Sequence, residues 1–327
     1  EGLVTPEGTA VLAEFLVEKP IELTEGFGVY FGAGPSATVH LGEDGVGVVA
    51  AALGGEELDE LLERRAGLVP FLLAQRLAGQ FIMDMHTHFL RDDTRIQSFL
   101  LQRQAVGKAG WNPAIKVEEQ TIEDLKFANY IKEIYLDSDT KVACISGAPS
   151  EIPGDWFLTN DMKVKYRAAI NGIAGSKRAF AHAIFTPGYP GWMEDIDRAI
   201  EVLKPDSMKG YTIGDNTNKH LSKHPWLLDD EKLVYPAYEK FQKAGLRNVC
   251  IHKGLFPPSV EKQFPHLLKY CRVDDVAKAA KDWPQLNFVI YHGGYRYAGG
   301  GRAEDAWDQF ERTGRIDWIT DLAEIPA

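Results

Sequence analysis

Two histidines on one predicted strand are the residues with the clearest chemistry in this sequence. They occur in the segment DMHTH (residues 84–88), at the end of the apolar run Phe81–Met85. Side chains alternate along a strand, so His86 and His88 point to the same side. Two imidazoles on one face can bind a divalent metal ion, although two ordinary histidines beside a core strand would give the same pattern. Asp84 lies on the same face. It either supports the histidines as a hydrogen-bond partner or is a carboxylate that satisfies polar groups of the core.

Two further histidines follow predicted buried strands later in the chain. His252 comes directly after Asn248–Ile251, and His292 directly after Asn287–Tyr291. Side chains at the C-terminal ends of parallel barrel strands converge on one point above the barrel axis. Either histidine alone is as compatible with a core position, but four histidines at three equivalent strand ends point to a shared cation. We assign His182 to the core and the other histidines to the surface: His40, His220, His224 and His266.

Strands and helices alternate from residue 80 onward, and this alternation is what would position the histidines. The short apolar runs are Phe81–Met85, Val142–Ile145, Ala179–Phe185, Ser207–Tyr211, Asn248–Ile251 and Asn287–Tyr291. The helix-like stretches are Ile122–Leu136, Asp161–Ala174, Met193–Leu203, Asp229–Ala244, Asp274–Asp282 and Arg302–Arg312. This order predicts an α/β fold with a parallel sheet, and no glycine fingerprint follows the first strand. We therefore predict a TIM-like (β/α)8 barrel.

The chain divides near residue 79. Residues 79–327 form the predicted barrel, and residues 1–78 are a small N-terminal segment to which we assign no role. Six strands are secure, and Trp318–Ile325 could be a strand or a helix. A closed eight-stranded barrel needs more chain than this, so we expect the sequence to be truncated before its last strands.

Residues 80–327 resemble the amidohydrolase superfamily, and within it the amidohydrolase-related family of aminocarboxymuconate-semialdehyde and resorcylate decarboxylases. The resemblance rests on the histidine pair of the first strand, Lys209 at the end of the fourth, His252 on the fifth and His292 on the sixth. It implies a distorted barrel that binds zinc, or alternatively manganese or iron, through His86, His88, His252 and an aspartate of the eighth strand. It also implies that His292 is catalytic and acts on water or substrate. The aspartate has no counterpart here, because Asp321, the only late candidate, falls too early.

The resemblance and the metal chemistry predict a metal-dependent hydrolase that uses a metal-activated water on a small-molecule substrate. A non-oxidative decarboxylase of an aromatic or enol carboxylate is the alternative, and a barrel that binds a metal or ligand without turnover is a third. Lys209 would be a metal ligand or a group that holds a substrate carboxylate. Arg91, Tyr211 and Lys253 are candidates for substrate binding, since each lies beside the predicted strand ends.

Composition limits the partners and the compartment. The chain has 327 residues with a net charge of −11, which argues against nucleic acid and anionic membranes as partners. No apolar run reaches the roughly 18 to 20 residues of a membrane helix. The sequence has three widely separated cysteines and no CxxC pair: Cys144, Cys250 and Cys271. This pattern indicates a reduced, cytoplasmic protein. An exported form is an alternative, because the twin arginines Arg64 and Arg65 precede an apolar stretch. The resemblance to the amidohydrolase-related family also implies a possible homodimer.

Overall fold

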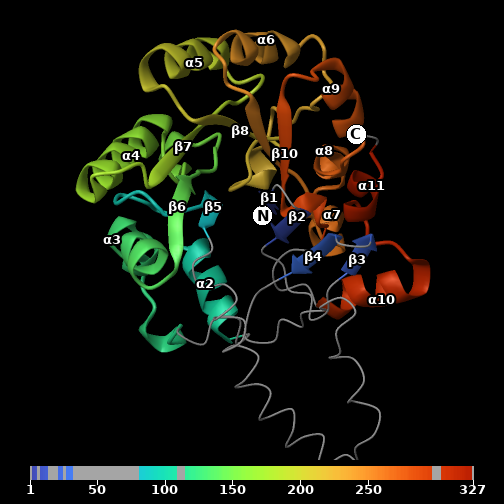
Figure 1. Ribbon diagram of the computed structural model, residues 1–327, viewed down its shortest axis with the longest axis horizontal. Coiled ribbons are helices and arrows are strands. Elements are labelled where there is room, and N and C mark those ends of the chain that lie inside the picture. Colours follow the sequence, from blue (N-terminus) through green and yellow to red (C-terminus); the bar gives the residue numbers. More distant parts are fainter. Residues whose placement is uncertain are drawn as a thin grey trace, which may run out of the picture.

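The computed structural model describes residues 81–108, 115–296 and 303–325, and the backbone of four short strands before residue 32 (Figure 1). These strands are β1 (Gly2–Thr5), β2 (Gly8–Ala13), β3 (Ile21–Thr24) and β4 (Phe27–Phe31), and they form a sheet of order β1-β2-β4-β3. The boundary expected near residue 79 lies outside the described residues, so the division into two parts stays a prediction.

The main sheet has six strands, and all six were predicted from the apolar runs. They are β5 (Ile82–Thr87), β6 (Thr140–Ile145), β7 (Ala179–Ile184), β8 (Ser207–Tyr211), β9 (Asn248–His252) and β10 (Asn287–Tyr291). Their order is β10-β9-β8-β7-β6-β5, and every neighbouring pair is parallel. Consecutive parallel strands place all their C-terminal ends at one edge of the sheet, where the predicted site residues lie.

Helices connect the strands and cover the outside of the sheet (Figure 1). They are α2 (Ser98–Lys108), α3 (Phe127–Ile131), α4 (Asn160–Ala174), α5 (Trp192–Arg198), α6 (Tyr235–Lys243), α7 (Pro258–Gln263), α8 (Leu268–Cys271), α9 (Val276–Asp282), α10 (Ala303–Thr313) and α11 (Ile319–Ala323). Three of the predicted helical stretches contain α3, α6 and α9, and the other three overlap α4, α5 and α10, each of which is displaced by one residue at its start. The segment left open between strand and helix, Trp318–Ile325, contains α11.

The sheet curls into a half-barrel, which confirms the predicted barrel-type fold. Its two edge strands, β5 and β10, share no backbone ladder. Nevertheless the Tyr291 hydroxyl at the end of β10 donates to the carbonyl oxygen of Met85 in β5, at 2.8 Å. The rings of Tyr291 and His86 are stacked, with their centroids 4.1 Å apart. Curvature therefore brings together side chains from the two ends of the sheet.

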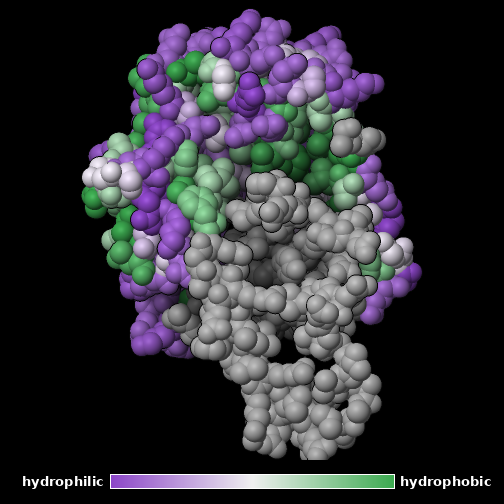
Figure 2. Space-filling model, viewed as in Figure 1, coloured by the Kyte–Doolittle hydropathy of each residue, from purple (hydrophilic) through white to green (hydrophobic). Residues whose placement is uncertain are grey.

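The largest apolar core lies between β7–β10 and the helices that cover them. It includes Met208, Val249 and Ile251 from the sheet and Tyr238 and Phe241 from α6, all completely or almost completely buried. Burial of each such side chain contributes roughly 1.5–3 kcal/mol relative to exposure. Polar side chains dominate the outer helices in Figure 2, whereas apolar residues gather near β10, whose Val289 is exposed. None of the described helices is both long and apolar enough to cross a membrane.

Candidate metal centre

The two histidines of β5 lie side by side at the C-terminal end of the strand. His86 Nε2 and His88 Nε2 are 2.9 Å apart, as expected for alternate residues on one face. As whole residues, His86 is half-buried and His88 is exposed. Asp84 accepts the backbone N–H of His86 at 3.0 Å through Oδ1, and burial raises the pKa of its carboxyl. Asp84 thus supports the strand at the point where it presents His86.

A second pair of histidines lies at the ends of β9 and β10. His252 Nδ1 and His292 Nε2 are 3.1 Å apart. The register of β8 and β9 pairs Tyr211 with His252, and their rings stack with centroids 4.8 Å apart. His292 has a φ of +61°, in the left-handed region that non-glycine residues rarely adopt. The chain turns sharply there, and this turn directs the imidazole toward His252.

The two pairs form one group. The rings of His86 and His292 have centroids 5.2 Å apart. Lys209, fully buried on β8, places Nζ 3.4 Å from His86 Nε2. The structure therefore brings together five predicted site residues, His86, His88, His252, His292 and Lys209. The histidines lie at or just after the ends of β5, β9 and β10, and Lys209 lies in the middle of β8.

Burial favours the neutral form of three of these imidazoles. The pKa values of His86, His252 and His292 lie well below the ordinary value, first because burial disfavours the charged ring. The nearby Lys209 lowers the pKa of each of them further, and burial lowers the pKa of Lys209 itself. A neutral imidazole is the form that binds a metal ion, so the donor set has the right chemistry.

The arrangement is not a preformed cage. Within the described part of the chain, no three His, Cys, Asp or Glu side chains are arranged around a point that could hold a metal ion. The nitrogens instead face one another in two pairs, at 2.9 and 3.1 Å. Two nitrogen ligands of a tetrahedral ion with bonds of about 2.0–2.1 Å lie roughly 3.3 Å apart. The residues thus fit a metal ion in type and spacing, and the imidazoles would have to turn toward a common point.

Three other predicted residues have partners of their own. Arg91 holds the carboxylate of Asp93 through two hydrogen bonds, at 2.5 and 2.8 Å. Lys253 is fully buried, and its Nζ lies 2.7 Å from Asp275. Among the described residues, the structure shows no hydrogen bond or ion pair from Arg91 or Lys253 to the four histidines. Substrate binding by these two residues therefore stays a prediction. Asp321 lies in α11 and pairs with Arg315 at 2.8 Å.

Three residues of this region were not predicted as functional. Tyr291 and His182 lie beneath the histidines, and the only sequence signal was the position of Tyr291 beside His292. Lys163 on α4 is fully buried, and its Nζ has no hydrogen-bond partner among the described residues. A lysine in an amphipathic helix is ordinarily a solvent-exposed residue, so no sequence pattern indicated its burial.

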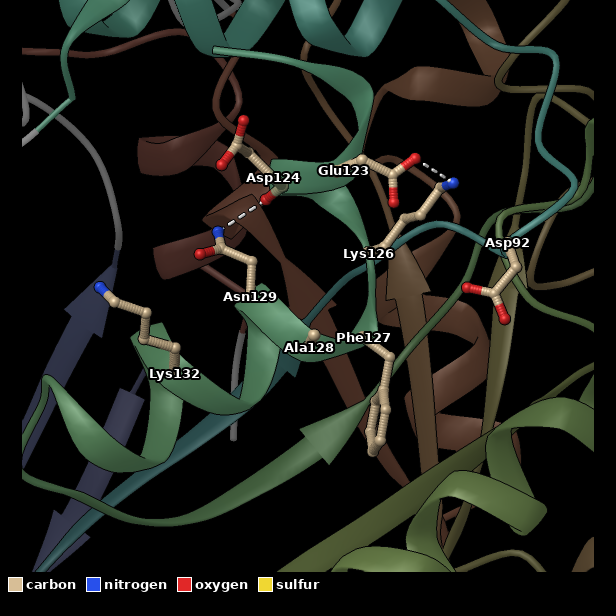
Figure 3. A pocket seen from close by; sticks show the side chains of 8 residues that line it. All are labelled: Asp92, Glu123, Asp124, Lys126, Phe127, Ala128, Asn129 and Lys132. Atoms are coloured by element: carbon tan, nitrogen blue, oxygen red, sulfur yellow. Dashed lines mark hydrogen bonds and ion pairs between the residues drawn. The ribbon is translucent and has the colours of Figure 1, made fainter. Parts of the chain in front are cut away.

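A separate surface hollow of about 400 Å³ lies beside α3 (Figure 3). It is lined by Asp92, Glu123, Asp124, Lys126, Phe127, Ala128, Asn129 and Lys132. It contains none of the predicted site residues, and Lys126 pairs with Glu123 at 2.6 Å. The group of histidines therefore stays the better candidate for a functional site.

No protein-family model and no curated protein matches this chain. Among solved structures, it is similar to an uncharacterized TIM-barrel protein from Bordetella bronchiseptica, with 18% identity and a TM-score of 0.44 over 66% of this chain and 68% of the other. IDCase from Metarhizium anisopliae has 17% identity and a TM-score of 0.35, over 74% and 76%. Dihydroorotase from Saccharomyces cerevisiae has 16% identity and a TM-score of 0.33, over 64% and 47%. Such values carry no conclusion about activity, and the family expected from the sequence stays a prediction.

Proposed function

We propose that this chain is a metal-dependent hydrolase of the amidohydrolase type that acts on a small-molecule substrate. The observation that carries the proposal is the gathering of four imidazoles from the ends of β5, β9 and β10, with nitrogen separations of 2.9 and 3.1 Å within the two pairs. Their lowered pKa values favour the proposal as well, because neutral imidazoles need not lose a proton before they bind a cation.

In this proposal His86, His88 and His252 hold the ion, which we take to be zinc, with manganese or iron as alternatives. A divalent ion supplies a water molecule of lowered pKa and polarises a substrate carbonyl group. Neutral His292 accepts a proton from a water molecule at the mouth, or donates a hydrogen bond to an oxygen on which negative charge develops. Tyr211, stacked on His252, forms one wall of the substrate site.

Two buried lysines favour a second candidate, a non-oxidative decarboxylase of a carboxylate substrate. No acidic side chain pairs with Lys163 or Lys209 in any ion pair recorded for the described residues. An unpaired buried charge is costly, and burial lowers the pKa of both amines, that of Lys163 to about 7. A bound carboxylate would supply the missing negative charge, which a neutral amide substrate would not do.

Metal binding is the first test. Metal-free protein is dialysed against zinc, manganese or iron, and the bound metal is measured by elemental analysis. We expect about one ion per chain, and His86→Ala and His252→Ala should each lose it. His266→Ala is the matched control, because His266 is an exposed histidine away from the strand ends. If the wild type retains no ion, or if His252→Ala retains as much as His266→Ala, the proposal fails.

Turnover separates the candidates. The metal-loaded protein is given small amides and esters in one panel and aromatic or enol carboxylates in another, with CO2 release as the readout of the second. Hydrolysis that His292→Ala reduces by about 10²–10⁴-fold would support the leading proposal. CO2 release that Lys163→Met abolishes would support the decarboxylase. A bound ion with no turnover in either panel would identify a metal-binding barrel without catalysis.

A further inference from the structure

A line of hydrogen bonds crosses the half-barrel beneath the candidate metal centre. Ser207 Oγ in β8 lies 2.5 Å from His182 Nδ1 in β7. His182 Nε2 lies 2.8 Å from the hydroxyl of Tyr291 in β10, and this hydroxyl donates to the Met85 carbonyl oxygen in β5 at 2.8 Å. Ser207, His182 and Tyr291 are all buried. The line thus links four strands and ends on the strand that carries His86 and His88.

The chemistry of these groups fixes which atom donates each hydrogen bond. Tyr291 uses its single hydroxyl proton for the Met85 carbonyl, so its oxygen accepts a hydrogen bond from His182 Nε2, which also lies 3.2 Å from the same Met85 carbonyl oxygen. A neutral imidazole carries one N–H, and therefore His182 Nδ1 accepts from the Ser207 hydroxyl. One tautomer of His182 then satisfies every group in the line. Buried polar groups that are fully satisfied hold a single arrangement firmly.

Tyr291 touches the candidate centre directly. Its ring stacks on the His86 ring at 4.1 Å between centroids, with 29° between the ring planes. Lys209 Nζ lies 3.5 Å from the centre of the same ring. In the chain, Tyr291 immediately precedes His292, and Met85 immediately precedes His86. The hydrogen bond between Tyr291 and Met85 therefore ties together the two backbone positions next to these histidines.

No backbone ladder of the sheet joins the same two strands. The strands β5 and β10 are the two edges of the sheet and form no ladder with each other. Among the described residues, the Tyr291–Met85 hydrogen bond and the stacking of Tyr291 on His86 join these two edges, and a line of buried hydrogen bonds is well suited to set their separation. We propose that Tyr291, held by His182 and Met85, is a positioning residue that fixes His86 relative to His292 in the candidate metal centre. This inference rests on the proposed function.

The test compares two buried tyrosines. Tyr291→Phe keeps the ring that stacks on His86 and removes only the hydroxyl. Tyr238→Phe is the matched control, because Tyr238 is completely buried and its hydroxyl has no hydrogen-bond partner among the described residues. Zinc and cobalt affinities are measured by chelator competition, well below the Tm of every variant. We expect Tyr291→Phe to bind about 10- to 100-fold more weakly, and Tyr238→Phe to bind like the wild type.

Two further readouts separate positioning from general stability. With saturating cobalt, the visible spectrum of Tyr291→Phe should differ from that of the wild type, because the geometry of the ligands changes, while Tyr238→Phe should keep the wild-type spectrum. In the metal-free protein, the ring nitrogen chemical shifts of His182 should report the tautomer protonated at Nε2. This last measurement needs no metal ion and reports on the hydrogen-bond line alone.

The outcomes distinguish the two proposals. If the wild type binds zinc and Tyr291→Phe binds it as tightly with an unchanged cobalt spectrum, the positioning role is overturned and the proposed function stands. Equal losses of affinity in Tyr291→Phe and Tyr238→Phe would also overturn it, since a loosened core would then be the cause. A His182 tautomer protonated at Nδ1 would contradict the line of hydrogen bonds. If the wild type itself binds no divalent ion, both proposals fall.

Discussion

Replacement of Gly254 by alanine tests whether close contact between two loops holds His252 against His292. Gly254 follows β9 and has a φ of +81°. A Cβ atom at this position would lie 2.2 Å from the carbonyl oxygen of Tyr295 and 2.7 Å from the carbonyl carbon of Gly294. Both atoms belong to the backbone after β10, so no side-chain rotation can make room. The loops must separate, and the histidines that they carry must separate with them.

The expected loss of stability follows from these contacts. Alanine in the left-handed region costs about 1–2 kcal/mol. Separation of the loops also strains two backbone hydrogen bonds, from Leu255 N–H to Tyr295 O at 2.6 Å and from Phe256 N–H to Arg296 O at 2.5 Å. Each is worth about 0.5–1.5 kcal/mol. Gly254→Ala should therefore lower the free energy of unfolding by about 2–5 kcal/mol, and should weaken zinc binding at least about tenfold.

Gly245→Ala is the matched control for this measurement. Gly245 follows α6 with a φ of +74°, and a Cβ there would meet no atom within 4 Å. It should lose only the left-handed contribution of about 1–2 kcal/mol and keep its zinc affinity. Urea denaturation and chelator competition measure both quantities. Equal losses of stability in the two variants would refute the role of the loop contact. A destabilised Gly254→Ala with wild-type zinc affinity would show that the loops do not position the histidines.

Two further predictions concern buried charges. Because burial lowers the pKa of Lys163 to about 7 from 10.5, unfolding takes up a proton at this lysine between these pH values, and Lys163 should make stability rise with pH there by up to ~1.4 kcal/mol per pH unit. Burial also lowers the pKa of Lys209, which adds a rise of its own, so Lys163→Met should reduce the rise in urea denaturation at several pH values without removing it. The same rise in both proteins would contradict the assignment. Asp275→Ala leaves Lys253 buried without its partner, and should cost about 3–5 kcal/mol of unfolding free energy. The double variant Lys253→Met/Asp275→Leu should lose less than this, and an equal loss would show that the unpaired charge is not the cause.

The strands and the ends of the strands were predictable because their signals are local. The inner strands of the main sheet are runs that a parallel sheet buries on both faces, as in β9 (Asn248–His252), whereas the edge strands β5 and β10 are only partly buried. A histidine at the end of such a run must lie at the mouth of a barrel, whatever the surrounding loops do. This reasoning from the sequence places His86, His252 and His292 at one mouth. The helix α2 was not predicted, because none of its residues is buried and its sequence carries little apolar periodicity.

The contacts beneath the histidines were not predictable because they depend on the curvature of the whole sheet. Tyr291 and Met85 are 206 residues apart, and Tyr291 and His182 are 109 residues apart. Sequence periodicity places each of these residues on a strand but does not say which strands approach across the barrel. His182 was correctly assigned to the core, and its link to Tyr291 arises only when β7 and β10 curve toward each other. Lys163 lies on α4, which packs against β7, and it is buried there although the helical pattern alone would leave it in solvent.

The two loops that carry His252 and His292 share one backbone feature, a glycine with positive φ two residues after the histidine. β9 ends at His252, and His292 directly follows β10; a glycine comes two residues after each histidine, Gly254 in one loop and Gly294 in the other, and both glycines have positive φ. After His252 the intervening residue is Lys253, whose side chain turns away to Asp275 and anchors its loop in the core. His292 itself adopts a left-handed conformation, which costs about 1–3 kcal/mol and persists only where the surroundings enforce it. The backbone bonds between the loops provide that enforcement, and strain of this kind is characteristic of functional positions. The folded structure thus holds the His252 and His292 imidazoles close together in spite of the backbone strain at His292, and core packing alone does not require this arrangement.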